Sequence, residues 1–311
     1  MRPAGVLAVV LVAALVAAGC GVGAGDAPDS VRLTVTDSFG ARTLLERASP
    51  EVRGEDTVMR LLQRNADVET KYGGGFVQSI DGKSGGRADG RPVDWFYFVN
   101  GVLAEKGAAA TEVRAGDRIW WDRHDWGLTN TVPAVVGSFP EPFAHGIDGE
   151  RLPTRIECEQ SVAAACDVVQ KKLAKLGIVA GKALPGTSSG VDVLRIAVGP
   201  WPALRDDSAL RQIERGPRAS GVYGRFSADG RQFLALDPRG RVVVDMGPGT
   251  GVIAATRYRE NAPVWAVTGT DAAGVHAAAD AFDESVLNEK FALAIGDDLP
   301  VPLPAIEGMP R

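Results

Sequence analysis

A predicted β-hairpin in the first half of the chain restricts its fold more than any other segment does. Residues 94–99 are aromatic and rich in strand-forming side chains, and Asn100-Gly101 follows them directly. Asn and Gly both tolerate positive φ, so this dipeptide is a strong signal for a two-residue hairpin turn, and Val102-Leu103 begin the returning strand. An antiparallel sheet is therefore expected in this part of the chain.

The segments on either side of the hairpin extend it to a small α+β pattern. Apolar and polar residues alternate over residues 31–36, which predicts a half-buried strand. A capping pair and apolar residues at helical spacing predict a helix over residues 56–66. A glycine-rich loop at 81–90 precedes the hairpin, and a Gly116-Asp117 turn with a strand at 118–122 follows it.

This succession resembles the transcobalamin carboxy-terminal-domain-like family, which is related to the soluble-ligand-binding β-grasp group. The motifs that carry the resemblance are Trp-x-Tyr-x-x-Asn-Gly at residues 95–101 and x-Gly-Asp-x-Ile-x-Trp at residues 115–121. The resemblance covers residues 31–127, about a third of the chain, and implies a β-grasp-like domain that binds a ligand. In transcobalamin itself a helical domain supplies much of the cobalamin pocket, and no such domain is indicated here. The expected ligand is therefore a cofactor or vitamin-like compound of open identity.

The first twenty residues predict export and lipid anchoring. The apolar run at 4–18 is shorter than the ~20 residues that a bilayer-spanning helix needs, and its length is typical of a secretory signal. Residues 17–20, Ala-Ala-Gly-Cys, resemble the lipobox of bacterial lipoproteins. That resemblance implies a signal peptide at 1–19, a lipidated Cys20 and a location on the extracytoplasmic face of the cell membrane. An ordinary cleaved secretory signal is the alternative. The residues after the cysteine lack apolar periodicity, so a flexible tether is expected at 20–30.

The second half of the chain predicts a separate α/β domain with a mixed sheet. A proline-containing linker at 128–154 leads into residues 155–297, where predicted strands and helices alternate. The strands are expected at 155–158, 194–198, 222–226, 233–236, 242–245, 264–267 and 291–295, and the helices at 161–176, 206–215 and 270–283. A tail at 298–311 contains four prolines and is expected to be extended. The predicted class is α+β, with an N-terminal β-grasp-like domain followed by this α/β domain.

Cys158 and Cys166 are predicted to form a disulfide. Exported proteins occupy oxidising compartments where disulfides persist. A strand end and the beginning of the next helix can bring two Cα atoms within the ~7 Å that the bond requires. A reactive thiol pair is the alternative, but neither a C-x-x-C spacing nor an adjacent histidine is present to activate a thiol.

Aromatic and polar residues around the hairpin form the candidate ligand or partner surface. Its members are Trp95, Tyr97, Asn100, Trp121, Asp122 and Trp126. Aromatic rings with one polar edge often line binding sites. Strand alternation places Trp95 and Tyr97 on one face and Phe96 and Phe98 on the other, and at least one face must belong to the core. The alternative is therefore that these rings mainly pack the domain.

A possible anion site follows the predicted strand at 264–267. Gly269, Thr270 and Asp271 lie at its carboxyl end and open a helix, whose free N–H groups can bind an anion. The Asp271 carboxylate can also cap those N–H groups and repel a phosphate. A capped helix is the alternative reading of this motif.

Charge and motif content limit the functional classes. With 34 basic and 39 acidic residues the formal net charge is −5, so the chain lacks the positive field of nucleic-acid-binding proteins. Three cysteines and three histidines are too few for the familiar Cys-rich or multi-histidine metal sites. No nucleophile-elbow or Ser-x-x-Lys motif is present. We therefore predict a non-enzymatic binding protein without cofactor or metal. A protein-interaction module of the envelope and an enzyme with an interdomain site are the alternatives.

Overall fold

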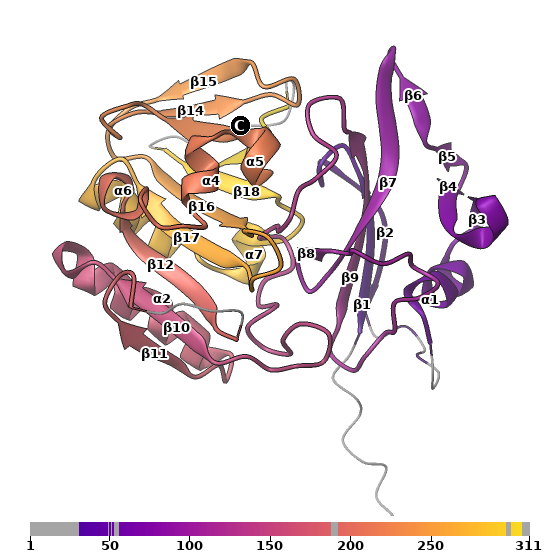
Figure 1. Cartoon of the computed structure of the whole chain (residues 1–311), viewed down its shortest axis with the longest axis horizontal. Helices are drawn as coiled ribbons and strands as arrows, with labels where there is room; N and C mark the ends of the chain where they lie inside the picture. Colours follow the sequence, from indigo (N-terminus) through magenta and orange to yellow (C-terminus); the bar gives the residue numbers. More distant parts are fainter. Residues whose placement is uncertain are drawn as a thin grey trace, which may run out of the picture.

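The computed structural model describes residues 31–48, 50, 52, 56–187, 192–296 and 300–306. The predicted signal peptide, Cys20 and the tether lie outside these residues. Figure 1 shows two adjoining regions, one built from the strands β1 to β9 and the other from β10 onward. Both regions combine sheets with a few helices, so the predicted α+β class is confirmed.

The N-terminal region is a mixed sheet covered on one face by the helix α1 (Val58–Asn65). Its strands are β1 (Arg32–Asp37), β2 (Arg42–Ala48), β3 (Val68–Lys71), β4 (Phe76–Ile80), β5 (Lys83–Ser84), β6 (Gly86–Ala88), β7 (Arg91–Val99), β8 (Val102–Leu103) and β9 (Arg118–Asp125), with the 3-10 turn η1 (Tyr72–Gly74). The main sheet has the order β2-β1-β9-β7-β6 with β8 paired to β7, and β3, β4 and β5 form a separate three-stranded sheet. β1 pairs antiparallel with β2 and parallel with β9, and β9 pairs antiparallel with β7.

The hairpin and the helix follow their sequence signals closely. Asn100 and Gly101 have φ values of 52° and 77°, the left-handed conformation that the predicted two-residue turn requires. The Thr57 side chain accepts a hydrogen bond from the Arg60 amide at the start of α1. The expected loop at 81–90 is partly wrong, because the short strands β5 and β6 form within it.

The C-terminal region is a larger mixed sheet with layers on both faces. Its elements are β10 (Thr154–Cys158), η2 (Gln160–Val162), α2 (Ala163–Lys175), β11 (Ala180–Ala183), β12 (Leu194–Pro200), α3 (Trp201–Leu204), α4 (Arg211–Glu214), α5 (Pro217–Ser220), β13 (Gly224–Phe226), β14 (Phe233–Leu236), β15 (Val242–Met246), β16 (Gly251–Thr256), β17 (Val264–Gly269), α6 (Ala272–Asp280), α7 (Glu284–Leu287), β18 (Ala292–Ile295) and β19 (Pro300–Leu303). The sheet order is β11-β10-β12-β17-β16-β18-β19. α2 and α6 cover one face, and β13 to β15 form a small sheet beside the other (Figure 1).

Several elements of this region differ from their predictions: the short helices α3, α5 and α7 and the strand β11 were not expected, and part of the tail expected to be extended forms the strand β19. The helix expected at 206–215 shortens to α4, because the Asp207 carboxylate accepts hydrogen bonds from the amides of Ala209 and Leu210 before the helix begins. The strand β16 was not predicted, since it is buried along its whole length and shows no alternation of polar and apolar residues.

One hydrophobic cluster joins the two regions. It contains Phe39, Phe98 and Trp120 of the N-terminal region together with Tyr223 and Phe291 of the C-terminal region. The segment expected to be a linker packs into the same interior: Val132 and Val135 belong to this cluster, and Val136, Phe139 and Phe143 belong to the cluster under α2 and α6. Residues 128–154 are therefore part of the core that holds the regions together.

The predicted disulfide is confirmed. Cys158 at the end of β10 and Cys166 in the first turn of α2 are bonded, with their Cα atoms 6.0 Å apart. Cys166 is fully buried beside Val162 and Val169 in the helix-covered cluster, so the bond fixes the start of α2 against the sheet.

Removal of this bond in a Cys158→Ser/Cys166→Ser variant is expected to lower the free energy of unfolding by about 2 to 3 kcal/mol, as loop-closure entropy predicts for so short a loop. Urea denaturation followed by circular dichroism measures the change, with the oxidised wild-type chain as reference. An unchanged midpoint would contradict the stabilising role.

Candidate functional site

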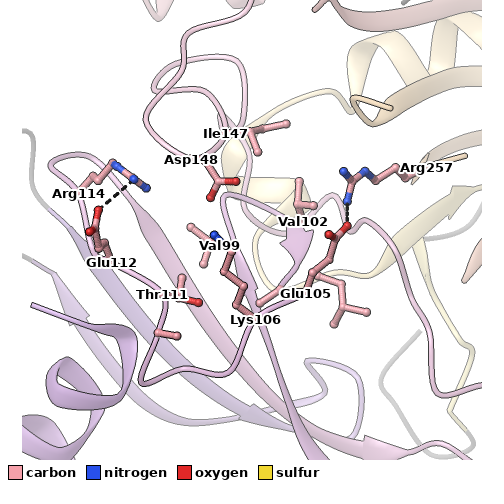
Figure 2. Close-up of a pocket in the computed structure, with 13 residues that line it drawn as sticks. Val99, Val102, Glu105, Lys106, Thr111, Glu112, Arg114, Ile147, Asp148 and Arg257 are labelled. Atoms are coloured by element: carbon pink, nitrogen blue, oxygen red, sulfur yellow. Dashed lines mark hydrogen bonds and ion pairs between the residues drawn. The ribbon is translucent and has the colours of Figure 1, made fainter. Parts of the chain in front are cut away.

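A cavity lies where the two regions meet. Its volume is about 340 Å³, which falls within the range of small-molecule sites, roughly 300–1,000 Å³. The apolar part of its lining comes from Val99, Val102, Leu103, Ala104, Ala110 and Ile147, and the polar part from Glu105, Lys106, Thr111, Glu112, Arg114, Asp148 and Arg257. Figure 2 shows that Arg257 enters from the C-terminal region and faces side chains of the N-terminal region. The cavity is thus completed by both.

Four of the charged lining residues form two ion pairs with one another. Arg257 Nη1 lies 2.6 Å from Glu105 Oε1, and the rest of its guanidinium donates to the carbonyl groups of Glu260 and Asn261. Arg114 Nη2 lies 3.1 Å from Glu112 Oε2. The first pair bridges the two regions at the cavity, where both residues belong to the lining. Because Glu105 and Glu112 are largely exposed, both pairs are weak and screened by solvent.

Lys106 and Asp148 remain as complementary charges within the lining. In Figure 2 the Lys106 side chain extends toward Asp148 from below. Neither group forms an ion pair with another residue in the part of the chain that the structure describes. The cavity therefore presents an ammonium and a carboxylate, above an apolar floor, that a bound molecule could engage.

Tyr97, one of the predicted surface residues, is buried and supports one wall of the cavity. Its hydroxyl donates to the carbonyl of Lys106 at 2.5 Å and lies 2.8 Å from Thr111 Oγ1. Burial raises the pKa of Tyr97, and the nearby Asp148 carboxylate raises it further. The phenol consequently stays protonated at neutral pH and keeps its hydrogen on the Lys106 carbonyl.

Asn100 is also buried and supports two other walls. Its amide nitrogen donates to Asp117 Oδ1 and to the carbonyl of Gly146, both at 2.9 Å, and its oxygen accepts from the Arg118 amide. Asp117 in turn accepts a hydrogen bond from the Arg114 amide. Through these contacts Asn100 holds the backbone at Arg114 and the turn that leads to Ile147 and Asp148.

Trp95, Trp121 and Asp122 are buried as well, so the predicted exposed surface is not formed. Trp95 donates to the carbonyl of Lys83, and Trp121 stacks on Tyr97 with ring centroids 4.7 Å apart. Asp122 accepts hydrogen bonds from Thr36, His124 and the amides of Phe39 and Gly40. The physical reason is that both faces of the sheet are covered, one by α1 and the other by the C-terminal region.

Trp126 is the predicted surface residue that remains partly accessible. Its indole nitrogen donates to Asp94, and the ring borders a shallow, open hollow of about 350 Å³ with Leu128, Thr129, Asn130 and Arg218. This hollow lies at the start of the segment 128–154. It is separate from the charged cavity, since the two share none of their lining residues.

The predicted anion site at Gly269, Thr270 and Asp271 is already filled by the protein's own groups. Asp271 accepts hydrogen bonds from the amides of Gly249 and Gly274, and the Thr270 hydroxyl oxygen accepts from the Thr250 amide. A Cβ placed on Gly269 would lie 2.6 Å from the Gly274 carbonyl carbon. The strand end is therefore packed directly against α6, and the capped-helix alternative is correct.

The charged residues of the cavity were not predicted from the sequence. Glu105, Lys106, Glu112 and Arg114 read as ordinary solvated loop residues, and Arg257 is more than one hundred positions away along the chain. Of the residues predicted from the sequence, Tyr97 and Asn100 are the ones that support this cavity, through hydrogen bonds to the backbone at Lys106 and Gly146.

Two features are absent from the part of the chain that the structure describes. None of the described helices combines the length and apolar character that spanning a bilayer requires. Among the described residues, no group of three or more His, Cys, Asp or Glu side chains is placed to hold a metal ion.

Comparison with known proteins gives a partial match. Residues 55–125 match a family described as a domain of unknown function, DUF4430. Among solved structures the chain is similar to the crystal structure of "a putative metal binding protein" from Ruminococcus gnavus ATCC 29149, with 17% identity and a TM-score of 0.25 over 31% of this chain and 97% of that one. No curated protein matches the chain.

Substitutions of Asn100 and Tyr97 can show that the two residues support different segments of the cavity. Asn100→Gly keeps the left-handed turn but deletes the amide, and it should cost about 2 to 3 kcal/mol because buried partners lose their hydrogen bonds. Tyr97→Phe should cost about 1 kcal/mol. Amide hydrogen exchange should accelerate near 114 and 146–148 in the first variant and near 106–111 in the second. The same pattern of exchange in both would argue against separate supports.

Proposed function

We propose that this protein is a lipid-anchored, non-enzymatic binding protein of the cell envelope, and that its ligand is a small molecule carrying both a positive and a negative group. The observation that carries the proposal is the cavity between the regions, with Lys106 and Asp148 as complementary charges that are not engaged with other described residues. The N-terminal region is proposed to be a transcobalamin carboxy-terminal-domain-like module, which the β-grasp strand order supports.

Charge complementarity favours a zwitterion over a singly charged ligand. An anionic group of the ligand would face the Lys106 ammonium, and a cationic group would face the Asp148 carboxylate. The floor formed by Val99, Val102 and Ile147 would contact the apolar part of the molecule. Both side chains are exposed to solvent, so a ligand with only one charge would engage one of them and leave the other hydrated, whereas a zwitterion would gain a charged contact with each.

The cavity volume limits the size of the ligand. A site of about 340 Å³ is at the lower end of the range for small-molecule pockets, so a molecule of metabolite size fits within it. A macrocycle as large as cobalamin would extend far beyond the lining residues. The vitamin-like ligand expected from the resemblance is therefore proposed to be a small zwitterionic compound rather than a corrinoid.

The two-region construction suits a binding function. Arg257 is oriented by the carbonyl groups of Glu260 and Asn261 in the C-terminal region, and it meets Glu105 of the N-terminal region at the cavity. A ligand that binds beside this ion pair would contact both regions. The C-terminal region thereby completes the site of the β-grasp module.

Zwitterionic ligands are expected to raise the melting temperature of the protein, by an amount equivalent to ~2.7 kcal/mol at one hundred times Kd. A thermal-shift screen should compare α-amino acids and betaines with amines and carboxylates of the same size. Lys106→Ala and Asp148→Ala should each weaken binding about tenfold or more, since each removes a charged contact.

Lys83→Ala and Asp245→Ala are matched control variants, because both residues lie away from the cavity. Equal binding of the singly charged compounds would contradict the zwitterion proposal. Recovery of the ligand in altered form after incubation would contradict the non-enzymatic role.

Lipid attachment at Cys20 is tested by growing cells that express the chain with an alkyne fatty acid. The wild-type chain should be labelled and should fractionate with membranes, whereas a Cys20→Ser variant should not be labelled. Two acyl chains or more give stable anchoring, so extraction should require detergent. An unlabelled, processed wild-type chain would instead indicate the ordinary secretory signal.

A further inference from the structure

Exposed lysines and apolar side chains gather at the outer edge of the C-terminal sheet. Four of the eight lysines of the chain lie between positions 171 and 182, on α2 and on the edge strand β11. Beside them, Val179 is 91% exposed, Leu184 56% and Leu176 45%. We call this set the edge patch; its members are Lys171, Lys175, Leu176, Val179, Lys182 and Leu184.

The local structure explains why these apolar residues face outward. Gly177 ends α2 in the left-handed conformation with φ 74°, and Ile178 directly after it is buried against the helix-covered cluster. With Ile178 fixed inside, the next residue, Val179, projects from the turn into solvent. β11 pairs only with β10 among the described strands, so no neighbouring strand covers this edge.

The charge of the edge patch is positive although the chain as a whole is negative. Lys182 pairs with Asp167, and Lys172, next to the patch, donates to the Asp280 carbonyl. Lys171 and Lys175 are exposed and form no ion pair with other described residues. Exposed lysines around protruding apolar side chains are the combination that binds anionic lipid surfaces, where the charges attract the headgroups and the apolar groups enter the interface.

A series of contacts links the helix that carries the edge patch to the beginning of the described chain. Lys172 contacts Asp280 and lies 3.9 Å from Asp283, which precedes α7. The next residue, Glu284, accepts a hydrogen bond of 3.0 Å from Arg32 at the start of β1. The junction of α6 and α7 thus links the helix that carries the patch to the strand at which the chain enters the fold.

We infer that the edge patch rests on an anionic lipid bilayer. The inference goes beyond the proposed ligand binding and rests on the proposed envelope location. Cys20 precedes Val31 by eleven residues, and so short a chain spans at most about 40 Å. An acylated Cys20 would therefore keep the fold close enough to the membrane for the patch to touch it, and this contact would fix which side of the protein faces outward.

The test uses the chain from Gly21 to Arg311, which carries no acyl group and retains every described residue. Its sedimentation with equimolar phosphatidylglycerol–phosphatidylcholine vesicles is compared with its sedimentation with phosphatidylcholine vesicles. Binding should be at least tenfold stronger to the anionic vesicles and should decline with added salt. Equal binding to both, or none to either, would overturn the inference.

Two variants locate the contact. Lys171→Glu/Lys175→Glu should lower the partition coefficient at least tenfold, because each lysine near an anionic surface contributes roughly fivefold. Val179→Asp should lower it as well, by removing the apolar group that enters the interface. Lys71→Glu/Lys83→Glu, the same charge change on the strands β3 and β5, should leave binding unchanged apart from a small general effect of net charge. An equal loss in this control would show attraction without a defined patch and would contradict the inference.

Failure of this inference is distinguishable from failure of the proposed function. Circular dichroism and melting curves test whether each variant is folded; Lys71, Lys171, Lys175 and Val179 are exposed and Lys83 is half-buried, so folded variants are expected. Fatty-acid labelling of Cys20 with no vesicle binding by the unacylated chain would refute the edge patch alone. Vesicle binding without labelling would support the patch and refute the lipid anchor.

Discussion

The contact of Phe291 with the N-terminal sheet is the interaction on which the arrangement of the molecule depends. Its ring lies 5.1 to 5.6 Å, centroid to centroid, from the rings of Phe39, Phe98, Trp120 and His124. Because Phe291 directly precedes β18, the C-terminal sheet fixes its position. The chain passes close by at Gly137, where a Cβ would lie 2.7 Å from the Trp120 ring and 2.6 Å from the Lys290 amide nitrogen. This close packing fixes the orientation of the two regions relative to each other, and in this orientation Arg257 forms its ion pair with Glu105.

The same packing turns a predicted surface into an internal support. A sheet with α1 on one face and the C-terminal region on the other has no aromatic face left for solvent, so Trp95 and Trp121 pack inward. The polar groups among the predicted residues then become the means by which the sheet holds its loops. Asn100 and Tyr97 fix the backbone at Arg114, Gly146 and Lys106 by buried hydrogen bonds. Buried hydrogen-bond networks of this kind position a site even though their members do not touch its ligand.

The proposed ligand site and the edge patch occupy different parts of the fold, and both combine charged side chains with neighbouring apolar ones. In the cavity, Lys106 and Asp148 stand over an apolar floor between the regions. At the sheet edge, Lys171 and Lys175 flank Val179 in the open. The first arrangement suits a small zwitterion because both signs of charge line one small cavity. The second suits a broad anionic surface because one sign dominates and the apolar groups protrude.

Local signals in the sequence determined the elements whose causes are local. The Asn100-Gly101 turn, the Thr57 cap of α1 and the Cys158–Cys166 bond depend on residues close together in the chain, and the structure confirms all three. Strand alternation also predicted that Trp95 and Tyr97 share a face, but it could not tell which faces would be covered. The cavity required the tertiary structure, since Arg257 reaches Glu105 across 152 positions of sequence. Short-range propensities carry no information about such contacts, which arise only when the Phe291 cluster brings the two regions together.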